Sequence, residues 1–477
     1  MPITFYWHDY ETFGADPRRD RPAQFAGIRT DEALNEIGEP LMMYCEPTRD
    51  YLPHPEACLL TGITPQLADE QGLPEPQFIA RIHAEFAQPN TCSVGYNSLR
   101  FDDEVTRFTL YRNFYDPYAR EWQQGNSRWD IIDLVRMTYA LRPAGITWPQ
   151  HEDGQPSFKL EDLVAANGIM HESAHDALSD VRATIALAHL LRSQQPRLYN
   201  WLLQLRDKRK AAAQLDLASH NPVIHTTRMY PAKTGCTSLV MPLIAEPGNS
   251  NSVLVYDLRH DPEMFLSLNA DELSQLLFTR TDELPAGKQR LPVKSIKINK
   301  CPALAPRNTL DHETAERIML DMAACYQHWQ TLCRYPDFFQ RVATAYINHD
   351  FQSNHDVDVA LYEGFLSSAD AVLLPQIQRA TPQQLASTRF DFRDQRLPEL
   401  LFRYRARNWP ETLTSAEKEQ WQEIRLRRLT QSNCGGGIIF EEFSAHLMAL
   451  RETYKADKSA QRILNDLEQW VSGLLNQ

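Results

Sequence analysis

The sequence predicts three parts: an N-terminal α/β domain, a small β domain and a C-terminal helical domain. From residue 1 to about 195, strand-like runs alternate with segments of helical apolar spacing, which is typical of a central sheet with packed helices. From about residue 220 to 300, short β runs are bounded by Pro, Gly and Asn, which indicates a small barrel or sandwich. From Glu313 onwards the pattern is mainly helical.

Local patterns predict the individual elements. Residues 4–7 and 93–96 have the composition of strands, and residues 35–40 that of a turn between two strands. The spacing of apolar residues predicts helices over residues 78–86, from about residue 102, and over roughly 176–193. In the second part we expect strands over residues 237–243, 252–258 and 291–298.

Length and composition limit the class of protein. With 477 residues the chain is longer than one hydrophobic core usually supports, and a 43% hydrophobic content is ordinary for a globular protein. No run of about 18 apolar residues occurs, so no transmembrane helix is expected. Residues 1–7 lack a basic segment and a long apolar core, which favours a first strand over a signal peptide.

Cysteine usage and charge bear on location and partners. The eight cysteines lie far apart without a Cys-x-x-Cys pair, which favours reduced thiols in a cytoplasm over disulfides or a zinc site. A formal net charge of -13 at first argues against a nucleic-acid partner. Local basic grooves would still allow one, and the acidity alone can simply reflect solubility.

The first predicted strand carries two acidic residues. Asp9 and Glu11 lie two positions apart, and a strand period of two puts both carboxylates on one face. Such a pair is costly unless a cation neutralises it. The alternative interpretation is a pair of solvated acids at a strand end, and this motif alone favours that alternative.

Two further segments offer acids and a histidine. Within residues 95–104 a strand runs into a helix N-terminus, where Asp102 or Asp103 could lie at the sheet edge or simply cap the helix. Within residues 175–184, His175 lies just before or at the start of a helix, and Asp180 is expected in its second turn. That spacing would let Asp180 hold a metal while His175 reaches over it, although a lone histidine is usually not catalytic.

The order D-x-E, N-x-x-x-F-D and H-x-x-x-x-D resembles the DEDDh exonuclease superfamily. Within it, the bacterial exonuclease I family is similar at residues 5–14, 20–26, 61–65, 111–118, 126–130, 298–302 and 404–410. The resemblance implies an RNase H-like exonuclease domain with a mixed central sheet (residues 1–195), an SH3-like β-barrel domain with a helical extension (196–348) and a C-terminal helical domain (352–477). It also implies a monomer.

The resemblance further implies an activity and the roles of five residues. Members of the family degrade single-stranded DNA processively from the 3′ end to 5′-mononucleotides, in DNA repair and recombination, with two Mg²⁺ ions for which Mn²⁺ can substitute. The acid directly after the Phe is the ligand, which selects Asp102. Asp9 would bridge both ions, Glu11 and Asp180 would complete the site of the attacking water, and Asp102 would support the second ion. His175 would take the proton from the water, as a pKa near 6.5 allows.

Single-strand binding without sequence readout needs cations along the backbone and aromatic platforms for the bases. Residues 107–136 interleave both kinds of side chain. Besides Glu11, the family positions expected to contact the substrate are Arg107, Tyr118, Trp122, Arg136, Lys159, Lys294, Asn299 and Tyr362. Lys159 stands where Arg is familiar, which keeps the charge but loses the bidentate fork. Contacts from three domains would form a clamp, although the lysines near Lys294 could also be a solvated strand face.

The family also binds the acidic, hydrophobic C-terminal tail of single-stranded-DNA-binding protein. Arg142 and Trp201 match positions near that docking site, with Trp where Tyr is familiar. Four neighbouring positions depart from the family pattern: Asn221, Pro306, Asp311 and Cys333.

Two alternatives to this function stay open. A 3′→5′ exoribonuclease would use the same catalytic residues, because the 2′-OH is recognised by surrounding contacts. A scaffold protein with an inactive site is the other alternative, and the complete set of five residues argues against it.

Overall fold

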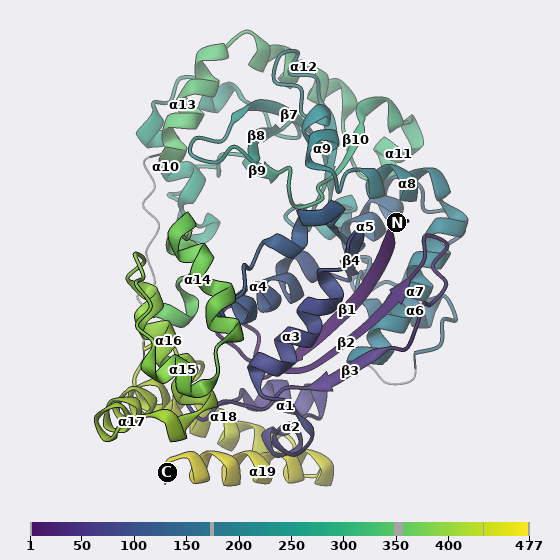
Figure 1. Cartoon of the computed structure of the whole chain (residues 1–477). Helices are drawn as coiled ribbons and strands as arrows, with labels where there is room; N and C mark the ends of the chain where they lie inside the picture. The colour runs from purple at the N-terminus through teal and green to yellow at the C-terminus, as the bar shows by residue number, and fades with distance from the viewer. Residues whose placement is uncertain (1, 172–175, 348–355, 433, 476–477) are drawn as a thin grey trace. The chain divides into compact units, whose positions relative to one another are not determined.

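The computed structural model describes residues 2–171, 176–347, 356–432 and 434–475. The chain forms two compact units (Figure 1). The first comprises Met1–Ser127, His171–Arg182 and Ser353–Gln477, and the second comprises Arg128–Met170 and Ala183–Gln352. The three domain boundaries expected from the sequence stay a prediction.

A mixed sheet forms the centre of the first unit. Its strands are β1 (Thr4–Thr12), β2 (Pro22–Thr30), β3 (Leu41–Tyr44) and β4 (Thr91–Gly95), in the order β3-β2-β1-β4. β1 pairs with β2 antiparallel and with β4 parallel, and β2 pairs with β3 antiparallel. β5 (Ser127–Asp130) begins where the chain passes from the first unit to the second. The expected mixed sheet is therefore confirmed.

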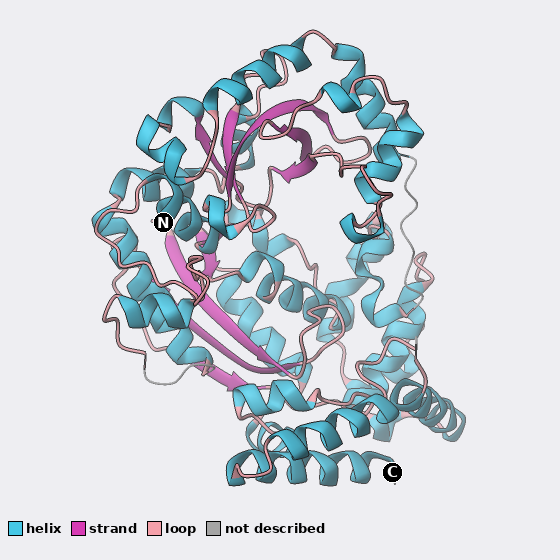
Figure 2. Ribbon diagram, turned by 180° about the vertical axis from the view of Figure 1, so that it is seen from behind, coloured by secondary structure: helices cyan, strands magenta, loops and turns pink. Residues whose placement is uncertain are grey.

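Helices cover one face of this sheet. α3 (Glu75–Phe86) and α4 (Asp102–Arg112) lie beside β1 and β2 in both views (Figures 1 and 2). Phe78 and Ile82 of α3 and Val105 of α4 pack in one cluster with Tyr10 and Phe25 of the strands. Since side chains alternate along β1, Asp9 and Glu11 point to the opposite face. Because Tyr10 packs in this core cluster, its neighbours Asp9 and Glu11 lie on the other face of the sheet.

The C-terminal segment of the first unit is helical, as expected. Its elements are η8 (Val357–Glu363), α14 (Ser368–Arg379), α15 (Pro382–Ser387), α16 (Arg396–Asn408), α17 (Ser415–Thr430), α18 (Phe440–Thr453) and α19 (Lys458–Leu475). Leu397 and Tyr404 of α16 pack against Phe108 and Tyr111 of α4. α18 and α19 contact α1 (Pro55–Thr61), and α19 also contacts α2 (Pro65–Gln71).

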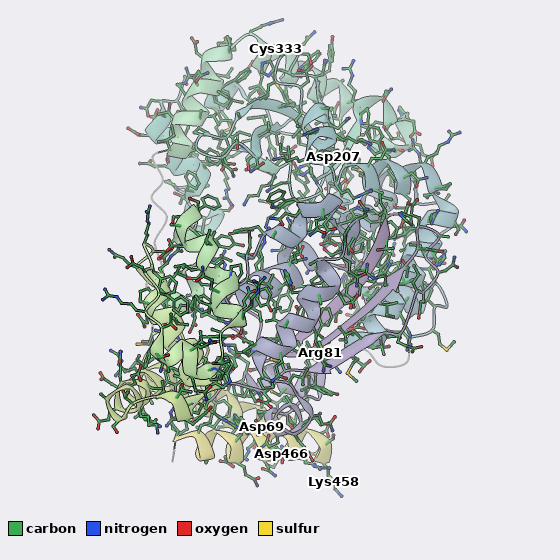
Figure 3. The ribbon with its side chains drawn as sticks, viewed as in Figure 1. Asp69, Arg81, Asp207, Cys333, Lys458 and Asp466 are labelled. Carbon is green, nitrogen blue, oxygen red and sulfur yellow. The ribbon has the colours of Figure 1, made fainter. Side chains whose placement is uncertain are left out.

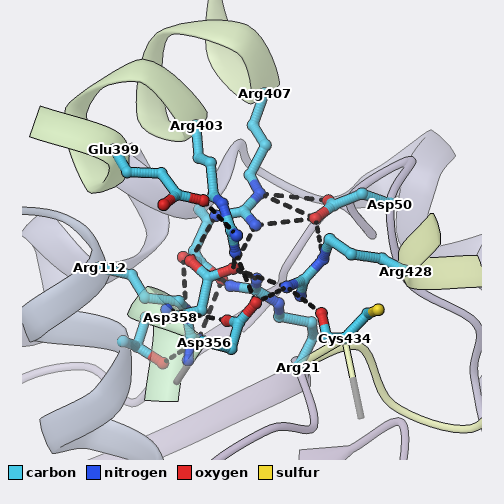
Figure 4. A network of polar contacts seen from close by, with 12 residues as sticks. Arg21, Asp50, Arg112, Asp356, Asp358, Glu399, Arg403, Arg407, Arg428 and Cys434 are labelled. Carbon is cyan, nitrogen blue, oxygen red and sulfur yellow. Dashed lines mark hydrogen bonds and ion pairs between the residues drawn. The ribbon is translucent and has the colours of Figure 1, made fainter. Parts of the chain in front are cut away.

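Buried charges join this segment to the N-terminal part of the same unit. We call them the Arg–Asp network; it consists of Arg21, Asp50, Glu75, Arg112, Asp356, Asp358, Glu399, Arg403, Arg407 and Arg428 (Figure 4). Arg407 illustrates it, because its Nη2 lies 2.7 Å from Asp50 Oδ2 and 2.5 Å from Asp358 Oδ2. The arginines hold the pKa of Asp358 well below its ordinary value despite the opposing effect of burial. Asp358 therefore stays ionised inside the protein.

The second unit contains a five-stranded antiparallel sheet. Its strands are β6 (Val223–Thr226), β7 (Thr237–Ala245), β8 (Ser252–Asp257), β9 (Val293–Lys297) and β10 (Ala303–Pro306). Its helices are α5 (Ile132–Leu141), α6 (Leu160–Ala166), most of α7 (Ala177–Gln194), α8 (Pro196–Gln204), α9 (Lys208–Gln214), α10 (Ala270–Phe278), α11 (His312–Arg317), α12 (Met322–Cys333) and α13 (Pro336–Ile347). The three β runs expected from the sequence coincide with β7, β8 and β9.

The sheet of the second unit is open, so the SH3-like β-barrel expected from the resemblance is not closed among the described residues. Its strand order is β10-β6-β7-β8-β9, which puts the consecutive strands β9 and β10 at opposite edges. Closure would require the edge strands to pair, and no such pairing occurs among the residues that the structure describes. Strand pairing of this kind depends on long-range geometry that local composition does not encode.

Two simpler expectations can be compared with the structure. All eight cysteines are free thiols. In the described part of the chain, no helix has the length and apolar character needed to cross a membrane.

Candidate active site

Asp9 and Glu11 extend from the face of β1 opposite to Tyr10, and both are half-buried. The strand is held in register by β2, in which Gln24 lies opposite Glu11. The pairing shifts between Glu11 and Thr12, and such irregularities often re-aim side chains next to active sites. The two acids thus lie near the C-terminal end of the central strand.

Asp180 joins them from the start of α7. The side chain of Gln24 accepts a hydrogen bond from the backbone N of Ala177 at 3.2 Å, which ties the beginning of α7 to β2. Each of the three acids Asp9, Glu11 and Asp180 offers one ligand atom, and these three atoms lie within 4.8 Å of one another. Asp180 lies in the first turn of α7, not in the second as the sequence suggested, because the helix begins at Ala177.

Asp102 is the first residue of α4 and is buried. Its Oδ1 accepts a hydrogen bond from the backbone N of Tyr10 at 2.9 Å, so it lies against the strand between Asp9 and Glu11. Asp103 instead forms an ion pair with Arg120 at 2.5 Å. The structure therefore brings Asp102 to the acidic strand and engages Asp103 elsewhere.

The four carboxylates repel one another. Burial raises the pKa of Asp9 well above its ordinary value, and the charges of Asp102, Glu11 and Asp180 add to the effect. Burial also raises the pKa of Glu11 to about 8, with further contributions from Asp180 and Asp102. Carboxylates with these neighbours favour a bound cation, since its charge removes the repulsion.

The donor set fits a hard divalent cation. Mg²⁺ and Mn²⁺ prefer carboxylate oxygens, whereas no Cys or His belongs to the described group of three. Asp9, Glu11 and Asp180 would hold such an ion, with Asp102 close enough to influence the pKa values of Asp9 and Glu11.

Two histidines are relevant to this site. His175, expected as the proton acceptor, lies outside the described residues. His171 was not singled out from the sequence, yet its Nε2 lies 2.6 Å from Asp180 Oδ1, with both side chains largely buried. The only signal in the sequence is a histidine nine positions before Asp180, which is too unspecific to have identified it.

The expected substrate contacts of the first unit differ in exposure. Trp122 is 66% exposed and Tyr362 is 47% exposed, as a base platform requires. Tyr118 is half-buried, with its ring centre 5.2 Å from Cζ of Arg107. Arg107 itself is only 5% exposed and forms ion pairs with Glu104 and Glu121, so its charge is already engaged.

The expected substrate contacts of the second unit also fall into two groups. Lys159 and Asn299 are exposed, and Lys159 Nζ lies 3.2 Å from Glu161. Arg136 is buried and forms an ion pair with Asp133 at 2.7 Å. Lys294 packs with Nζ 4.9 Å from the ring centre of Tyr230, and burial lowers its pKa.

The two residues expected at the partner site line one pocket of the second unit. The pocket has a volume of about 490 Å³ and is formed by Arg142, Gln195, Pro196, Arg197, Leu198, Trp201, Ala305, Pro306 and Thr309. Arg142 Nη2 donates to the carbonyl of Thr309 at 3.1 Å, and Trp201 Nε1 donates to the carbonyl of Leu304 at 2.8 Å. Both side chains are therefore held in place at the pocket.

A mixed sheet with a D-x-E pair on its central strand, and further acids from two helix starts, is the arrangement of a metal-dependent exonuclease domain. Family models agree: residues 6–188 match the family described as Exonuclease, residues 206–348 the Exonuclease I SH3-like domain, and residues 355–474 the Exonuclease I C-terminal domain. The chain belongs to the exonuclease I family and is a nuclease, which is a phosphodiester hydrolase.

Individual relatives match over nearly their whole length. Exodeoxyribonuclease I of Escherichia coli is 45% identical over 473 residues, which cover 99% of this chain and 98% of the relative. A moderately thermophilic exonuclease I from Methylocaldum szegediense has a TM-score of 0.95 and 49% identity, with 99% of each chain covered. The E. coli exonuclease I in complex with a dA16 oligonucleotide has a TM-score of 0.95 and 45% identity, covering 99% of this chain and 100% of that one.

Proposed function

We propose that this chain degrades single-stranded DNA processively from the 3′ end, releases 5′-mononucleotides and depends on Mg²⁺, in DNA repair and recombination. The observation that carries the proposal is the group of Asp9, Glu11 and Asp180, whose ligand atoms lie within 4.8 Å of one another. The relatives support the substrate, because the E. coli enzyme is known in complex with a dA16 oligonucleotide. A zinc-bound form of that enzyme with single-stranded DNA supports a metal site. We further infer a cytoplasmic monomer.

Each catalytic residue has a distinct task in this proposal. Asp9, Glu11 and Asp180 would hold the metal ions, with Asp102 assisting from the start of α4. Two Mg²⁺ ions, when bound, supply Lewis-acid stabilisation of the charge that develops on the phosphate oxygens. His175 takes a proton from the attacking water, for which an imidazole is suited near neutral pH. Mn²⁺ has similar ligand preferences and is expected to substitute.

The single strand would be held by aromatic and basic side chains. Trp122 and Tyr362 are exposed enough to stack on bases. Lys159 and Asn299 are exposed enough to contact the sugar–phosphate backbone of the DNA. Tyr118, Arg107, Arg136 and Lys294 would contribute mainly by packing beside these contacts, because each is at least half-buried.

A protein partner is supported by the pocket of Arg142 and Trp201. Its lining combines the cations of Arg142 and Arg197 with apolar side chains, which suits an acidic, hydrophobic peptide. A solved structure named for SSB and exonuclease I in complex with an inhibitor is 43% identical to this chain, with a TM-score of 0.92. We therefore propose that the tail of single-stranded-DNA-binding protein docks in this pocket.

Digestion of 5′-labelled single-stranded DNA with Mg²⁺, beside matched RNA and duplex DNA, tests the proposed activity. Single-stranded DNA should shorten from its 3′ end, and Asp180→Ala should abolish the reaction because the metal loses a ligand. Equal digestion of RNA would instead favour the exoribonuclease alternative. No cleavage of any substrate would favour the scaffold alternative.

A further inference from the structure

A set of polar contacts joins η8 of the C-terminal segment to the catalytic helix α4. The hydroxyl of Tyr362 donates a hydrogen bond to Glu104 Oε2 and accepts one from Arg107 Nη1 at 3.0 Å. Arg107 Nη1 also donates to Glu104 Oε1 at 2.8 Å. Tyr362 lies far from Glu104 and Arg107 in the sequence but in the same compact unit, and Glu104 is two positions after Asp102.

Burial makes these contacts strong. Glu104 is 8% exposed and Arg107 is 5% exposed, so water competes poorly for their charges. Hydrogen bonds to ionised partners are shorter and stronger than neutral ones. On its other side Arg107 binds Glu121 through Nε at 2.7 Å and through Nη2 at 2.9 Å, which fixes the direction of the guanidinium. The Tyr362 hydroxyl thus meets two preoriented charged groups.

The ring and the hydroxyl of Tyr362 have different surroundings. Edge-to-face contact with Phe108, at 5.5 Å between ring centres, supports the ring from α4. Arg18 approaches the ring with Cζ at 5.9 Å from its centre. Almost half of the side chain remains exposed, at 47%. One side chain can therefore offer a surface to a base while its hydroxyl holds η8 on α4.

The opposite end of η8 is fixed by the Arg–Asp network (Figure 4). Asp358, the second residue of η8, lies 3.0 Å from Nη1 of Arg403 and 3.2 Å from Nη1 of Arg428. Asp356, the residue before η8, accepts from Arg403 and Arg428 at 2.9 Å each. With this end anchored among buried charges, the Tyr362 contacts determine whether the other end stays on α4.

We propose that Tyr362, Glu104 and Arg107 form a latch that holds η8 closed on the catalytic helix and lengthens the run of nucleotides removed per binding event. The effect on run length rests on the proposed exonuclease activity. The latch itself is a property of the DNA-free protein. In this latch Arg107 and Glu104 are positioning residues that act through Tyr362. The role of the hydroxyl is separate from any stacking by the ring.

Tyr362→Phe separates the two roles, because it keeps the ring and removes the hydroxyl. Hydrogen exchange of the η8 amides in the DNA-free protein should become faster by about tenfold or more, as loss of a hydrogen bond to a charged group allows. The run length on long single-stranded DNA, measured with a trap for released enzyme, should shorten. Glu104→Gln should have both effects while the single-turnover cleavage of a trinucleotide changes by less than about twofold. The double variant should add little to either single one.

Tyr454→Phe is the matched control, since Tyr454 is an exposed tyrosine of the same C-terminal segment. Exchange in η8 that stays at the wild-type rate in Tyr362→Phe and Glu104→Gln would overturn the latch. Faster hydrogen exchange in η8 with an unchanged run length would show that the latch does not affect processivity. If the protein cleaves no DNA at all, the proposed function fails, and the exchange measurement still decides whether the latch exists.

Discussion

Asp9 and Glu11 are unfavourable neighbours until a cation joins them. Burial and the nearby charges of Asp102 and Asp180 raise the pKa values of both groups. A divalent ion would convert four mutually repelling carboxylates into its ligands and first neighbours. The metal-free protein should therefore carry a local instability that metal binding relieves.

Addition of Mg²⁺ or Mn²⁺ should raise the Tm of the wild-type protein by a few degrees, because a ligand that binds only the folded state stabilises it. Asp9→Asn should raise the Tm of the metal-free protein and lose most of the metal-dependent increase. Differential scanning fluorimetry with EDTA and with each metal measures both effects. The control is Asp69→Asn, the same substitution at a side chain paired with Arg49 on the surface (Figure 3). An equal metal-dependent rise in Asp9→Asn would exclude Asp9 as a ligand.

His175→Ala should lower turnover by about 10²-fold or more, the usual scale of general acid–base catalysis, while DNA binding persists. Single-turnover digestion and a binding titration in Ca²⁺ separate the two properties. Near-normal turnover in this variant would remove His175 from the mechanism.

His171→Ala should act through the metal. Its contact with Asp180 resembles the outer-shell partners that orient metal ligands, whose loss typically costs 10–100-fold in metal affinity or activity. The variant should need more Mg²⁺ for half-maximal rate and should regain much of the lost rate at high Mg²⁺. A rate deficit that is the same at every Mg²⁺ concentration would contradict this role.

At the scale of elements, the site depends on β1, β2 and the first turn of α7. Alternation along β1 was readable from the sequence because a period of two needs only local information. The hydrogen bond from Ala177 to Gln24 joins residues 153 positions apart, so local sequence patterns could not predict it. Arg107 was expected at the substrate, yet its partner Tyr362 lies 255 positions away. Sequence reasoning thus predicted several of the helices and strands and singled out the acidic residues, but it did not predict the contacts that orient them.

Glu75 links α3 to the Arg–Asp network and gives it a pH dependence. Burial alone would raise the pKa of Glu75, but Arg112 and Arg21 lower it to about 2. The ordinary value is about 4.3. The folded pKa is depressed, so its stabilisation is complete above about pH 4.3 and is lost as the pH falls towards 2.

Glu75→Gln should lower the free energy of unfolding by about 3 kcal/mol at neutral pH, because Arg21 and Arg112 lose a buried partner. The gap between variant and wild type should narrow progressively as the pH falls from about 4.3 towards 2. Urea unfolding followed by tryptophan fluorescence at pH 6, 4 and 3 measures the gap. Glu419→Gln, on the exposed face of α17, is the control. A gap that stays constant over this range would show that Glu75 is not the titrating group.

At the scale of the whole molecule, the formal net charge of -13 must be reconciled with polyanionic partners. Arginine is mostly engaged with acids in the first unit, where the Arg–Asp network alone contains five arginines. We therefore expect recognition of anions to depend on a few cations placed at specific sites. Arg142 and Arg197 at the pocket of the second unit are two of them.

Binding of an acidic, hydrophobic tail peptide tests this view at the pocket. Arg142→Ala should weaken binding by about tenfold or more, because a charge-assisted contact to a carboxylate is lost. Trp201→Ala should weaken it through the loss of apolar surface, so only Arg142→Ala should reduce the dependence of affinity on salt. Fluorescence anisotropy of a labelled peptide at two salt concentrations distinguishes the effects. Arg280→Ala removes an exposed arginine of the same unit and should bind as wild type does. Equal affinities of the Arg142→Ala and Arg280→Ala variants for the peptide would place the partner site elsewhere. The protein, with its net negative charge, would then have to bind the acidic peptide without Arg142.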